Sequence, residues 1–492
     1  MIGITILGFP TEILLLFVGQ LELSDVFNFL SACSSLRKLC DVPSLWISLL
    51  QRTKLRRKIA CPTGTDLRNL QSKDLQIIAR HTNRLEINWQ SEAPRFLKPA
   101  DFTLPDILTA RHIWLLSVVP GTSMAILRAH GVGNKETLLL WPIGKPESLI
   151  MTIISAYSFV TFAFYHQSDR LLLACTTLLE EDVSRSVAIP QRLQIFSIFY
   201  ESKFVELVYE VSVRGKVLSL GLSKDILAFI YSKDEDPPMY YLTTANYTTN
   251  RSLNVLFNPY SNFQYLGDPC LIVLDHKFLL AVGNRFTYDL HQFSPKALLL
   301  GAEEHTTPVG SLKNPITKVA HFRSPGGGFN SPIGGRPFVL MERMLWSPIG
   351  AYAIHSGRFI LSQSAGHFYT TVHFWPYLRG AEELETTTRM CSDDARVTVE
   401  LDGLFHQYAI SHSGAYAVLS MGNSDASAGE VVQLLHFIRD PLHIDVRRIT
   451  LPVCAAHNPP TTHTRRSLEI DDRKGVIYIS HGSSQFRAVR FA

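Results

Sequence analysis

Three runs of adjacent acidic residues are the first candidates for chemistry in this chain. They are Glu180-Glu181-Asp182, Glu303-Glu304 and Glu382-Glu383. A glycosidase needs two carboxylates that flank one scissile bond, one acting as acid and the other as base or nucleophile. Carboxylates that are neighbours within polar runs are typical of exposed loops instead. These runs therefore favour solvated loops over a catalytic centre.

Histidine and cysteine are the next candidates, because both could bind a metal. None of the 18 histidines lies in an H-x-E or H-E-x-x-H spacing or has a cysteine partner at ligand spacing. His406 and His412 are six residues apart in "FHQYAISHSG", which favours a packed ring and a turn residue. The seven cysteines are odd in number, far apart and never in a C-x-x-C pair: Cys33, Cys40, Cys61, Cys175, Cys270, Cys391 and Cys454. We expect a reducing compartment, no disulfide framework, no metal and no cofactor.

Phosphate binding and nucleophilic catalysis also lack their motifs. The glycine-rich stretch "SPGGGFNSPIGG" contains neither G-x-x-x-x-G-K-[ST] nor G-x-G-x-x-G after a strand. It is predicted to be a loop. A G-x-S-x-G nucleophile motif is also missing from the chain. We therefore expect a protein that is not an enzyme.

The composition indicates a folded chain without an obligatory polyanionic partner. Of the 492 residues, 46% are hydrophobic and 18% are charged, and the net charge is only +4. Such a chain can bury a large core, and it has no long basic run that would indicate nucleic acid or an anionic membrane. The length allows about three domains, or a small module joined to one large repetitive domain. Because no stretch is apolar enough to span a membrane, we expect the cytoplasm or nucleus.

The stretch "GFPTEILLLFVGQLELSDVF" could be a signal peptide, a buried core helix or a surface for another protein. A signal peptide fits poorly, because no Lys or Arg precedes the run and Ile13 to Val18 is too short. Pro10 suits the first position of a helix, and Glu12 suits its positive end. Apolar residues at helical spacing then form one broad stripe: Ile13, Leu14, Phe17 and Leu21.

Further short helices are expected up to about residue 90. Ser24 and Asp25 are typical of a helix start, and a third short helix should end before a break at Pro43. A fourth helix should carry Trp46, and another should open at Ser72. The cluster Lys54, Arg56, Arg57 and Lys58 could be a nuclear localisation signal, but its helical context favours a solvated basic face.

Residues 9 to 46 as a string resemble the F-box. That pattern opens with hydrophobic-Pro-x-Glu-Ile-Leu and closes with Pro-x-Leu-Trp. The chain supplies Phe9-Pro10-x-Glu12-Ile13-Leu14, Phe17, Leu21, Asp25-Val26, Cys33, Arg37 and Pro43-x-Leu45-Trp46. It departs at Leu36, where the family usually has Trp, and at Phe9, where Leu is usual. A helical cap packed on the rest of the chain would explain the apolar stripes but not the distance between the two ends of the pattern.

The resemblance implies an F-box over residues 5–50, followed by a helical linker over 51–90. A module of about forty residues cannot bury such wide apolar stripes alone, so another surface must cover part of them. In the family, that cover is the Skp-type adaptor of cullin-RING ubiquitin ligases. The resemblance implies an adaptor-binding set, some of whose members must instead hold the helices together: Pro10, Ile13, Leu14, Phe17, Leu21, Leu30, Cys33, Leu36, Leu45 and Trp46.

Residues 91–492 change to short β-branched and aromatic runs separated by turn residues, which predicts an all-β region. A turn followed by a short apolar strand recurs seven times, beginning at Pro120, Ser168, Ser223, Asp275, Ser347, Ser411 and Asp471. Successive copies are 48 to 72 residues apart, about the length of a four-stranded blade with loops. We expect a seven-bladed β-propeller without the Trp-Asp signature of WD repeats. A pair of β-sandwiches is the alternative.

The overall order, F-box and then divergent propeller, resembles F-box proteins of mushroom-forming fungi. The resemblance implies a non-catalytic substrate receptor of a Skp-cullin-F-box ubiquitin ligase, in which the propeller binds a protein target. Two alternatives are an F-box scaffold without a degradative role and a propeller enzyme with an F-box-like cap. The enzyme would need carboxylates or metal ligands that converge in the central funnel.

Overall fold

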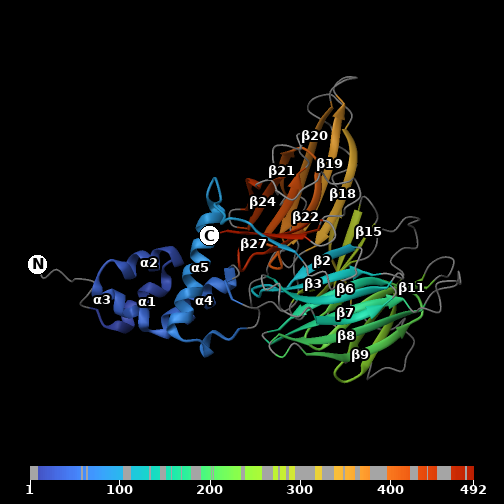
Figure 1. Cartoon of the computed structure of the whole chain (residues 1–492), viewed down its shortest axis with the longest axis horizontal. Coiled ribbons are helices and arrows are strands. Elements are labelled where there is room, and N and C mark those ends of the chain that lie inside the picture. Colours follow the sequence, from blue (N-terminus) through green and yellow to red (C-terminus); the bar gives the residue numbers. More distant parts are fainter. Residues whose placement is uncertain are drawn as a thin grey trace, which may run out of the picture.

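The computed structural model has a small helical head followed by a large all-β region, as the sequence predicts (Figure 1). It describes residues 9–56, 59–61, 65–103, 112–131, 135–143, 151–156, 158–167, 169–178, 190–200, 202, 204–233, 239–257, 270–274, 277–283, 287–293, 316–323, 337–346, 350–360, 366–376, 396–421, 430–439, 442–451, 467–481 and 485–491.

In its described residues, the head contains five α-helices with two 3-10 turns between them. Their bounds are α1 (Thr11–Gln20), α2 (Leu23–Ser31), α3 (Ser34–Arg37), η2 (Lys38–Asp41), α4 (Pro43–Arg56), η3 (Leu67–Asn69) and α5 (Ser72–Gln90). The predicted start at Ser72 is correct, and Pro43, where a break is predicted, is the first residue of the helix that carries Trp46.

Two predicted helix starts need small corrections. Pro10 has an extended ψ of 150° and precedes α1, while its carbonyl accepts hydrogen bonds from the amides of Ile13 and Leu14. Helix α2 begins at Leu23 rather than at Ser24, because Glu22 is the extended residue whose carbonyl accepts the first helical bonds. In both places the last extended residue before the helix sets the boundary.

Helix α5 belongs to two hydrophobic cores. Leu75 and Ala79, in its first half, pack with α1 to α4 in the core of the head. Leu85 and Trp89, in its second half, pack instead with strands of the β region. One continuous helix therefore joins the head to the β region.

Within the described residues, the β region forms seven four-stranded antiparallel sheets. In chain order, the first sheet contains β2 (His112–Val118), β3 (Met124–His130), β4 (Glu136–Pro142) and β5 (Met151–Ala156), and the second contains β6 (Phe159–His166), β7 (Arg170–Leu178), β8 (Gln191–Phe199) and β9 (Val205–Val213). The third contains β10 (Lys216–Leu222), β11 (Ile226–Lys233), β12 (Met239–Asn246) and β13 (Arg251–Phe257), and the fourth contains β14 (Cys270–Leu274), β15 (Lys277–Gly283), β16 (Thr287–Phe293) and β17 (Ile316–Arg323). The fifth sheet contains β18 (Pro337–Trp346), β19 (Gly350–Ile360), β20 (Gly366–Pro376) and β21 (Val397–Asp402), and the sixth contains β22 (Phe405–Ile410), β23 (Tyr416–Met421), β24 (Glu430–Arg439) and β25 (Leu442–Leu451). The seventh contains β26 (Ser467–Asp471), β27 (Val476–His481) and β28 (Gln485–Arg490) together with β1 (Ala100–Thr103).

The recurring phrase of the sequence has one structural meaning. Each of its seven copies coincides with the connection between the first and second strands of one sheet, from β2–β3 around Pro120 to β26–β27 after Asp471. A turn residue and a buried second strand are needed at the same place in every sheet. The repeat therefore reflects one supersecondary unit used seven times, rather than two large sheets of a sandwich pair.

Apolar clusters fill the spaces between consecutive sheets. Six such clusters contain buried residues of the β region, and each joins two sheets that follow one another, with the last sheet joined to the first. Side chains of one sheet also accept hydrogen bonds from the first strand of the next. These bonds are Phe159 N to Glu136 (2.7 Å), Val217 N to Gln191 (3.0 Å), Leu271 N to Ser219 (2.9 Å), Phe405 N to Ser356 (3.4 Å) and Leu115 N to Ser467 (3.2 Å). Among the described residues, packing joins six pairs of consecutive sheets, and five of these pairs also share a directional hydrogen bond.

One sheet contains both ends of the β region. Strand β1 pairs with β28 in the register Ala100↔Ala488 to Thr103↔Gln485, and Arg487 donates to the Asp101 carboxylate at 2.7 Å. Because the first and last strands share one sheet, the chain cannot open at this point without losing their pairing.

Helix α5 packs against this sheet and against the preceding sheet, β22–β25 (Figure 1). The Trp89 ring lies 4.4 Å from that of Tyr416 and 5.8 Å from that of Phe491, measured between centroids. The Arg473 guanidinium donates to the carbonyl of Cys61 at 2.8 Å. Aromatic packing and this buried bond hold the head in one orientation on the β region.

The turn between β26 and β27 is itself held by a buried carboxylate. Asp471 accepts hydrogen bonds from the amides of Gly121 (3.0 Å), Arg473 (3.0 Å) and Lys474 (3.2 Å). Burial, with the neighbouring Asp472, raises the pKa of Asp471 to about 6. This carboxylate orders the residues that contact the head and links them to the adjacent sheet.

Candidate interaction surface of the helical head

Helix α1 has one buried side and one exposed apolar side. Leu14 and Val18 are buried in the core of the head. The exposed fractions of Ile13, Leu16 and Phe17 are 46%, 67% and 47%. Burying a side chain of this size stabilises a protein by about 1.5–3 kcal/mol relative to leaving it in water, so a cluster of them at one helix is unfavourable unless something covers it.

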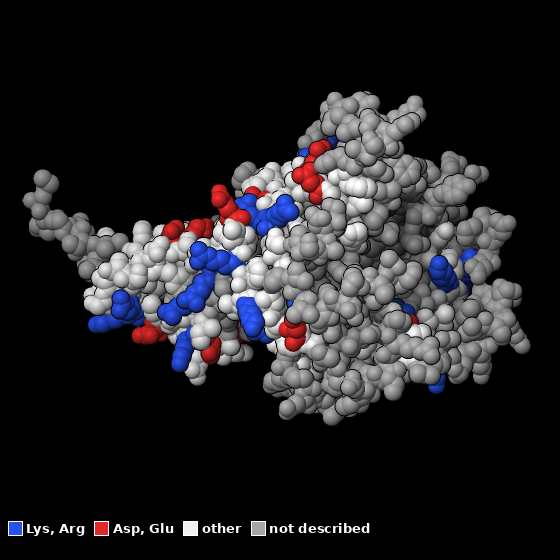
Figure 2. Space-filling model, turned by 45° about the horizontal axis from the view of Figure 1, so that its top comes forward, with Lys and Arg blue, Asp and Glu red and all other residues white. Residues whose placement is uncertain are grey.

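Phe9 extends this surface beyond the start of the helix, with an exposed fraction of 44%. We call Phe9, Ile13, Leu16 and Phe17 the α1 surface. Glu12 is the single charged residue of α1. On the face shown in Figure 2, Lys and Arg side chains lie close to Asp and Glu side chains over the helical head. The α1 surface is therefore distinguished by exposed apolar area rather than by charge.

Contacts from other helices hold α1 in place. The Arg52 guanidinium on α4 donates to the carbonyls of Gly19 and Leu21, at the end of α1 where helical carbonyls lack partners. A cation there also complements the negative end of the helix dipole. The Phe17 ring lies 5.5 Å from that of Phe29 on α2. The α1 surface is thus presented on a helix that is fixed at its end and along its side.

The structure divides the ten residues of the expected adaptor-binding set into three groups. Pro10, Ile13 and Phe17 are exposed, and Leu21 and Cys33 are half-buried. The other five are buried in the core of the head and do not line its surface: Leu14, Leu30, Leu36, Leu45 and Trp46. Trp46 also donates its indole N–H to the carbonyl of Cys40 at 2.7 Å, which fixes α4 to the turn before it. These five hold the helices together.

Sequence reasoning missed two members of the α1 surface, Phe9 and Leu16. One signal was present, because six consecutive apolar residues, Ile13 to Val18, exceed what one face of a helix can bury. Phe9 opens the F-box pattern, where it replaces the usual Leu, but the resemblance does not place it in the adaptor-binding set. The basic cluster has no side-chain description, since Arg57 and Lys58 lie outside the described residues and only the backbone of Lys54 and Arg56, in α4, is described.

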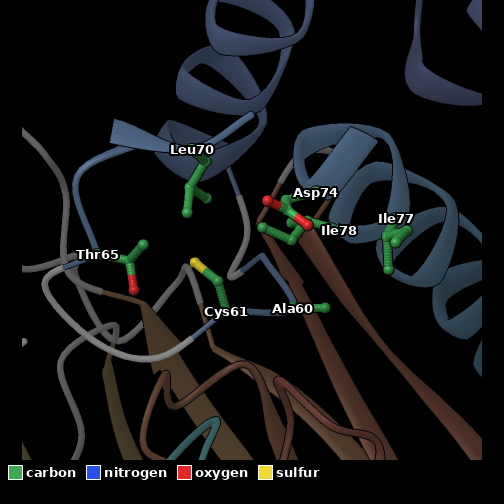
Figure 3. Close-up of a pocket in the computed structure, with 7 residues that line it drawn as sticks. All are labelled: Ala60, Cys61, Thr65, Leu70, Asp74, Ile77 and Ile78. Carbon is green, nitrogen blue, oxygen red and sulfur yellow. The ribbon is translucent and has the colours of Figure 1, made fainter. Parts of the chain in front are cut away.

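A pocket of about 250 Å³ lies beside the first half of α5 (Figure 3). Its lining residues are Ala60, Cys61, Thr65, Leu70, Asp74, Ile77 and Ile78. Pockets that bind small molecules usually measure about 300–1,000 Å³ and carry several convergent polar groups. This lining is mainly apolar and contains a single carboxylate. It lacks the groups that a catalytic centre or a cofactor site needs.

The residues considered for metal binding or catalysis are only partly described. His406 is exposed on β22, while His412 lies in the following turn and packs its ring against that of His166, 4.9 Å between centroids. Burial lowers the pKa of His166 well below its usual value. No group of three or more metal-ligating side chains occurs among the described residues. The three acidic runs and "SPGGGFNSPIGG" lie outside them.

The chain resembles known proteins only at low sequence identity. No family model matches the chain, and no curated protein does. Among solved structures, an oligogalacturonate lyase in complex with manganese is 11% identical, covering 82% of this chain and 99% of its own, with a TM-score of 0.43. The WD40 domain of SCAP from fission yeast is 9% identical over 80% of this chain and 98% of its own, with a TM-score of 0.38. The β-propeller domain of the Trilobed protease from Pyrococcus furiosus is 8% identical over 76% of this chain and 92% of its own, with a TM-score of 0.36.

These similarities do not show what the chain binds or whether it catalyses a reaction. Among the helices that are described, none is both long enough and apolar enough to cross a membrane.

Proposed function

We propose that this chain is a non-catalytic substrate-recognition subunit of a Skp-cullin-F-box ubiquitin ligase. The observation that carries the proposal is the α1 surface, an apolar patch on a helix whose other side is buried in the head. It coincides with the opening of the F-box pattern, Phe9-Pro10-x-Glu12-Ile13-Leu14. In that family the corresponding surface is covered by a Skp-type adaptor, which brings the cullin-RING complex.

The adaptor-docking set that we propose is narrower than the one implied by the resemblance. Phe9, Ile13, Leu16 and Phe17 contact the adaptor, because their exposed area is available without unfolding the head. Pro10, Leu21 and Cys33 are proposed as secondary contacts, since Pro10 and Leu21 flank α1, Cys33 precedes α3, and all three are exposed or half-buried.

The β region is proposed to be a seven-bladed β-propeller that holds a protein target. Seven four-stranded sheets, the contacts between consecutive sheets and the shared sheet of β1 and β28 support this arrangement. A closed ring of blades protects sheet edges in a large all-β chain and presents loops from every blade.

In this proposal, the chain acts by raising the effective concentration of the target near the ubiquitin-charged enzyme. The head docks on the adaptor, the β region holds a target, and a target lysine is kept near the ubiquitin-charged enzyme that the complex supplies. The rigid junction through α5 matters here, because a fixed head transmits the position of the target more precisely than a flexible linker would. No residue of this chain needs to touch the reacting atoms.

The test is capture of the full chain by a purified Skp-type adaptor. A variant with Ile13→Asp and Leu16→Asp changes two exposed side chains, so the head should stay folded and binding should fall by about 100-fold or more. Leu14 is a poor choice for substitution, because it is buried and an Asp there would unfold the head.

A matched control is available on α5. Ile77 and Ile87 have exposed fractions of 57% and 56%, so Ile77→Asp with Ile87→Asp introduces the same charge at sites of similar exposure. This control should bind as the wild type does. The proposal fails if folded wild-type protein captures no adaptor, or if the α1 variant binds as well as the control.

A further inference from the structure

Strand β9 is an outer strand with unusual exposed residues. It is the last strand of its sheet, in the order β6-β7-β8-β9. Phe204, Leu207 and Val208, within or next to β9, have exposed fractions of 56%, 47% and 37%. We call Phe204 to Val208 the β9 patch.

Other outer strands of the described β region expose polar residues at such positions. Examples are Thr152 on β5, Asn254 on β13, Glu400 on β21 and Thr450 on β25. Polar or charged residues on an edge strand discourage pairing with another chain, because the edge has unpaired amides and carbonyls. Among the sheets whose outer strand has described side chains, only the sheet β6–β9 exposes large apolar residues at this strand. An exposed apolar edge of this kind favours the addition of a partner strand.

A bulge limits where a partner strand can pair. Ile195 on β8 pairs with Tyr209, whereas Phe196 pairs with Leu207, so Val208 is an extra residue. Beyond the bulge the side chains change face. Leu207 shares a face with Phe196, which packs toward the sheet β2–β5, while Tyr209 packs toward the sheet β10–β13. A regular partner ladder therefore fits along Phe204 to Leu207, where the exposed apolar residues lie.

Charge indicates the chemistry of the occupant. Glu206 is exposed in the middle of the patch, and among the described residues it has no ion pair. Glu210 is already engaged by Gln194 at 2.7 Å and Arg192 at 3.5 Å. A second β9 strand contains no Lys or Arg between Val205 and Val213, so it cannot place a cation opposite Glu206 in any register. A cationic partner segment is complementary, and a second copy of this chain is not.

We propose that the β9 patch binds an extended segment of a partner protein, with apolar residues at alternate positions and a Lys or Arg opposite Glu206. Main-chain hydrogen bonds to the edge of β9 supply affinity, and the apolar and charged side chains supply selectivity. This inference rests on the proposed function, because it places the target of the β region at one blade edge.

The experiment uses fluorescein-labelled, capped nine-residue peptides in which Ile alternates with Thr, and in which one Thr near the centre is replaced by Lys (the Ile/Lys peptide) or by Glu (the Ile/Glu peptide). Binding to the full chain is followed by fluorescence anisotropy. The Ile/Lys peptide should bind about tenfold tighter than the Ile/Glu peptide, since one cross-strand pair changes from attraction to repulsion. N-methylation of alternate amides on the edge that faces β9 should abolish binding, whereas methylation of the other edge should preserve it.

A Leu207→Thr, Val208→Thr variant removes the apolar contact and keeps strong β formers at exposed positions, so the fold should persist, as thermal unfolding will show. It should weaken the Ile/Lys peptide about tenfold or more, whereas Ile77→Thr with Ile87→Thr on α5 should leave it unchanged.

The inference is overturned if the two peptides bind equally, if both methylated forms bind, or if sedimentation detects a dimer that the β9 variant dissociates. Adaptor capture is measured separately on the same proteins. If the peptide results contradict this inference but the adaptor is still captured, the proposed role of the head is unaffected. If the adaptor is not captured, the proposed function is wrong.

Discussion

Replacing Gly475 by Ala is expected to strain the junction between the head and the β region. Gly475 has a φ of +64°, where a side chain costs about 1–2 kcal/mol. An added Cβ would also lie well inside the contact distance of Leu85 Cδ1 and 3.1 Å from its Cδ2. Leu85 is buried and cannot easily turn away, and overpacking of this kind typically costs about 1–3 kcal/mol. Together we expect a loss of about 3 kcal/mol.

A double variant that also changes Leu85 separates the two causes of this loss, which are the backbone strain at Gly475 and the collision with the Leu85 side chain. Leu85→Ala alone should cost about 3 kcal/mol through the cavity it leaves between α5 and the β region. In the double variant the collision is absent, so the Gly475→Ala substitution adds only its backbone strain to the cost of the cavity. The double variant should therefore be more stable than additivity predicts by about 2 kcal/mol.

The assay is urea unfolding followed by two signals, helical circular dichroism at 222 nm and tryptophan emission. Because α5 belongs to both cores, the junction variants should shift the midpoints of both signals to lower urea. The reasoning is refuted if Gly475→Ala is neutral, if the two substitutions are additive, or if the helical signal alone moves.

Two further predictions concern other elements. Burial raises the pKa of Glu469 to about 8, so the stability linked to its protonation is present at low pH and is lost as the pH rises through 8. Between pH 6 and 8, urea unfolding should show wild type losing about 2 kcal/mol relative to Glu469→Gln, and parallel curves for the two proteins would contradict this. Gly19→Ala should stabilise α1 by about 0.5 kcal/mol, because a Cβ there meets nothing within 4 Å and Ala favours helix. Thermal melting of the head should shift upward, and a lower midpoint would disprove the assignment of free space.

Local signals predicted many elements of the fold. Pro43 begins α4 because its ring suits the first position of a helix, and Ser72 is the first residue of α5. The seven recurring phrases locate seven hairpins, since a turn residue next to a short apolar strand is encoded within a few residues. Helix boundaries differed by one residue at Pro10 and Ser24, where the extended residue before each helix was not distinguishable by type.

The candidate surface was only partly predictable. Apolar type and helical spacing placed Ile13, Leu14 and Phe17 in one stripe, but they could not tell which side of α1 faces the core. Leu14 is buried and Phe17 is exposed because α4 and the other helices pack on one side of α1. Trp46, large and apolar, is a core residue for the same reason.

The sequence by itself determined the local elements, namely short helices at the beginning, seven turn-and-strand units after them, and an apolar excess in the first helix. The tertiary structure alone decided that α5 joins two cores, that β1 pairs with β28, and that Phe204 to Val208 remain exposed at an edge. The physical reason is the range of the interactions. Hydrogen bonds within a helix or hairpin leave a period in neighbouring residues, whereas contacts between distant segments leave none.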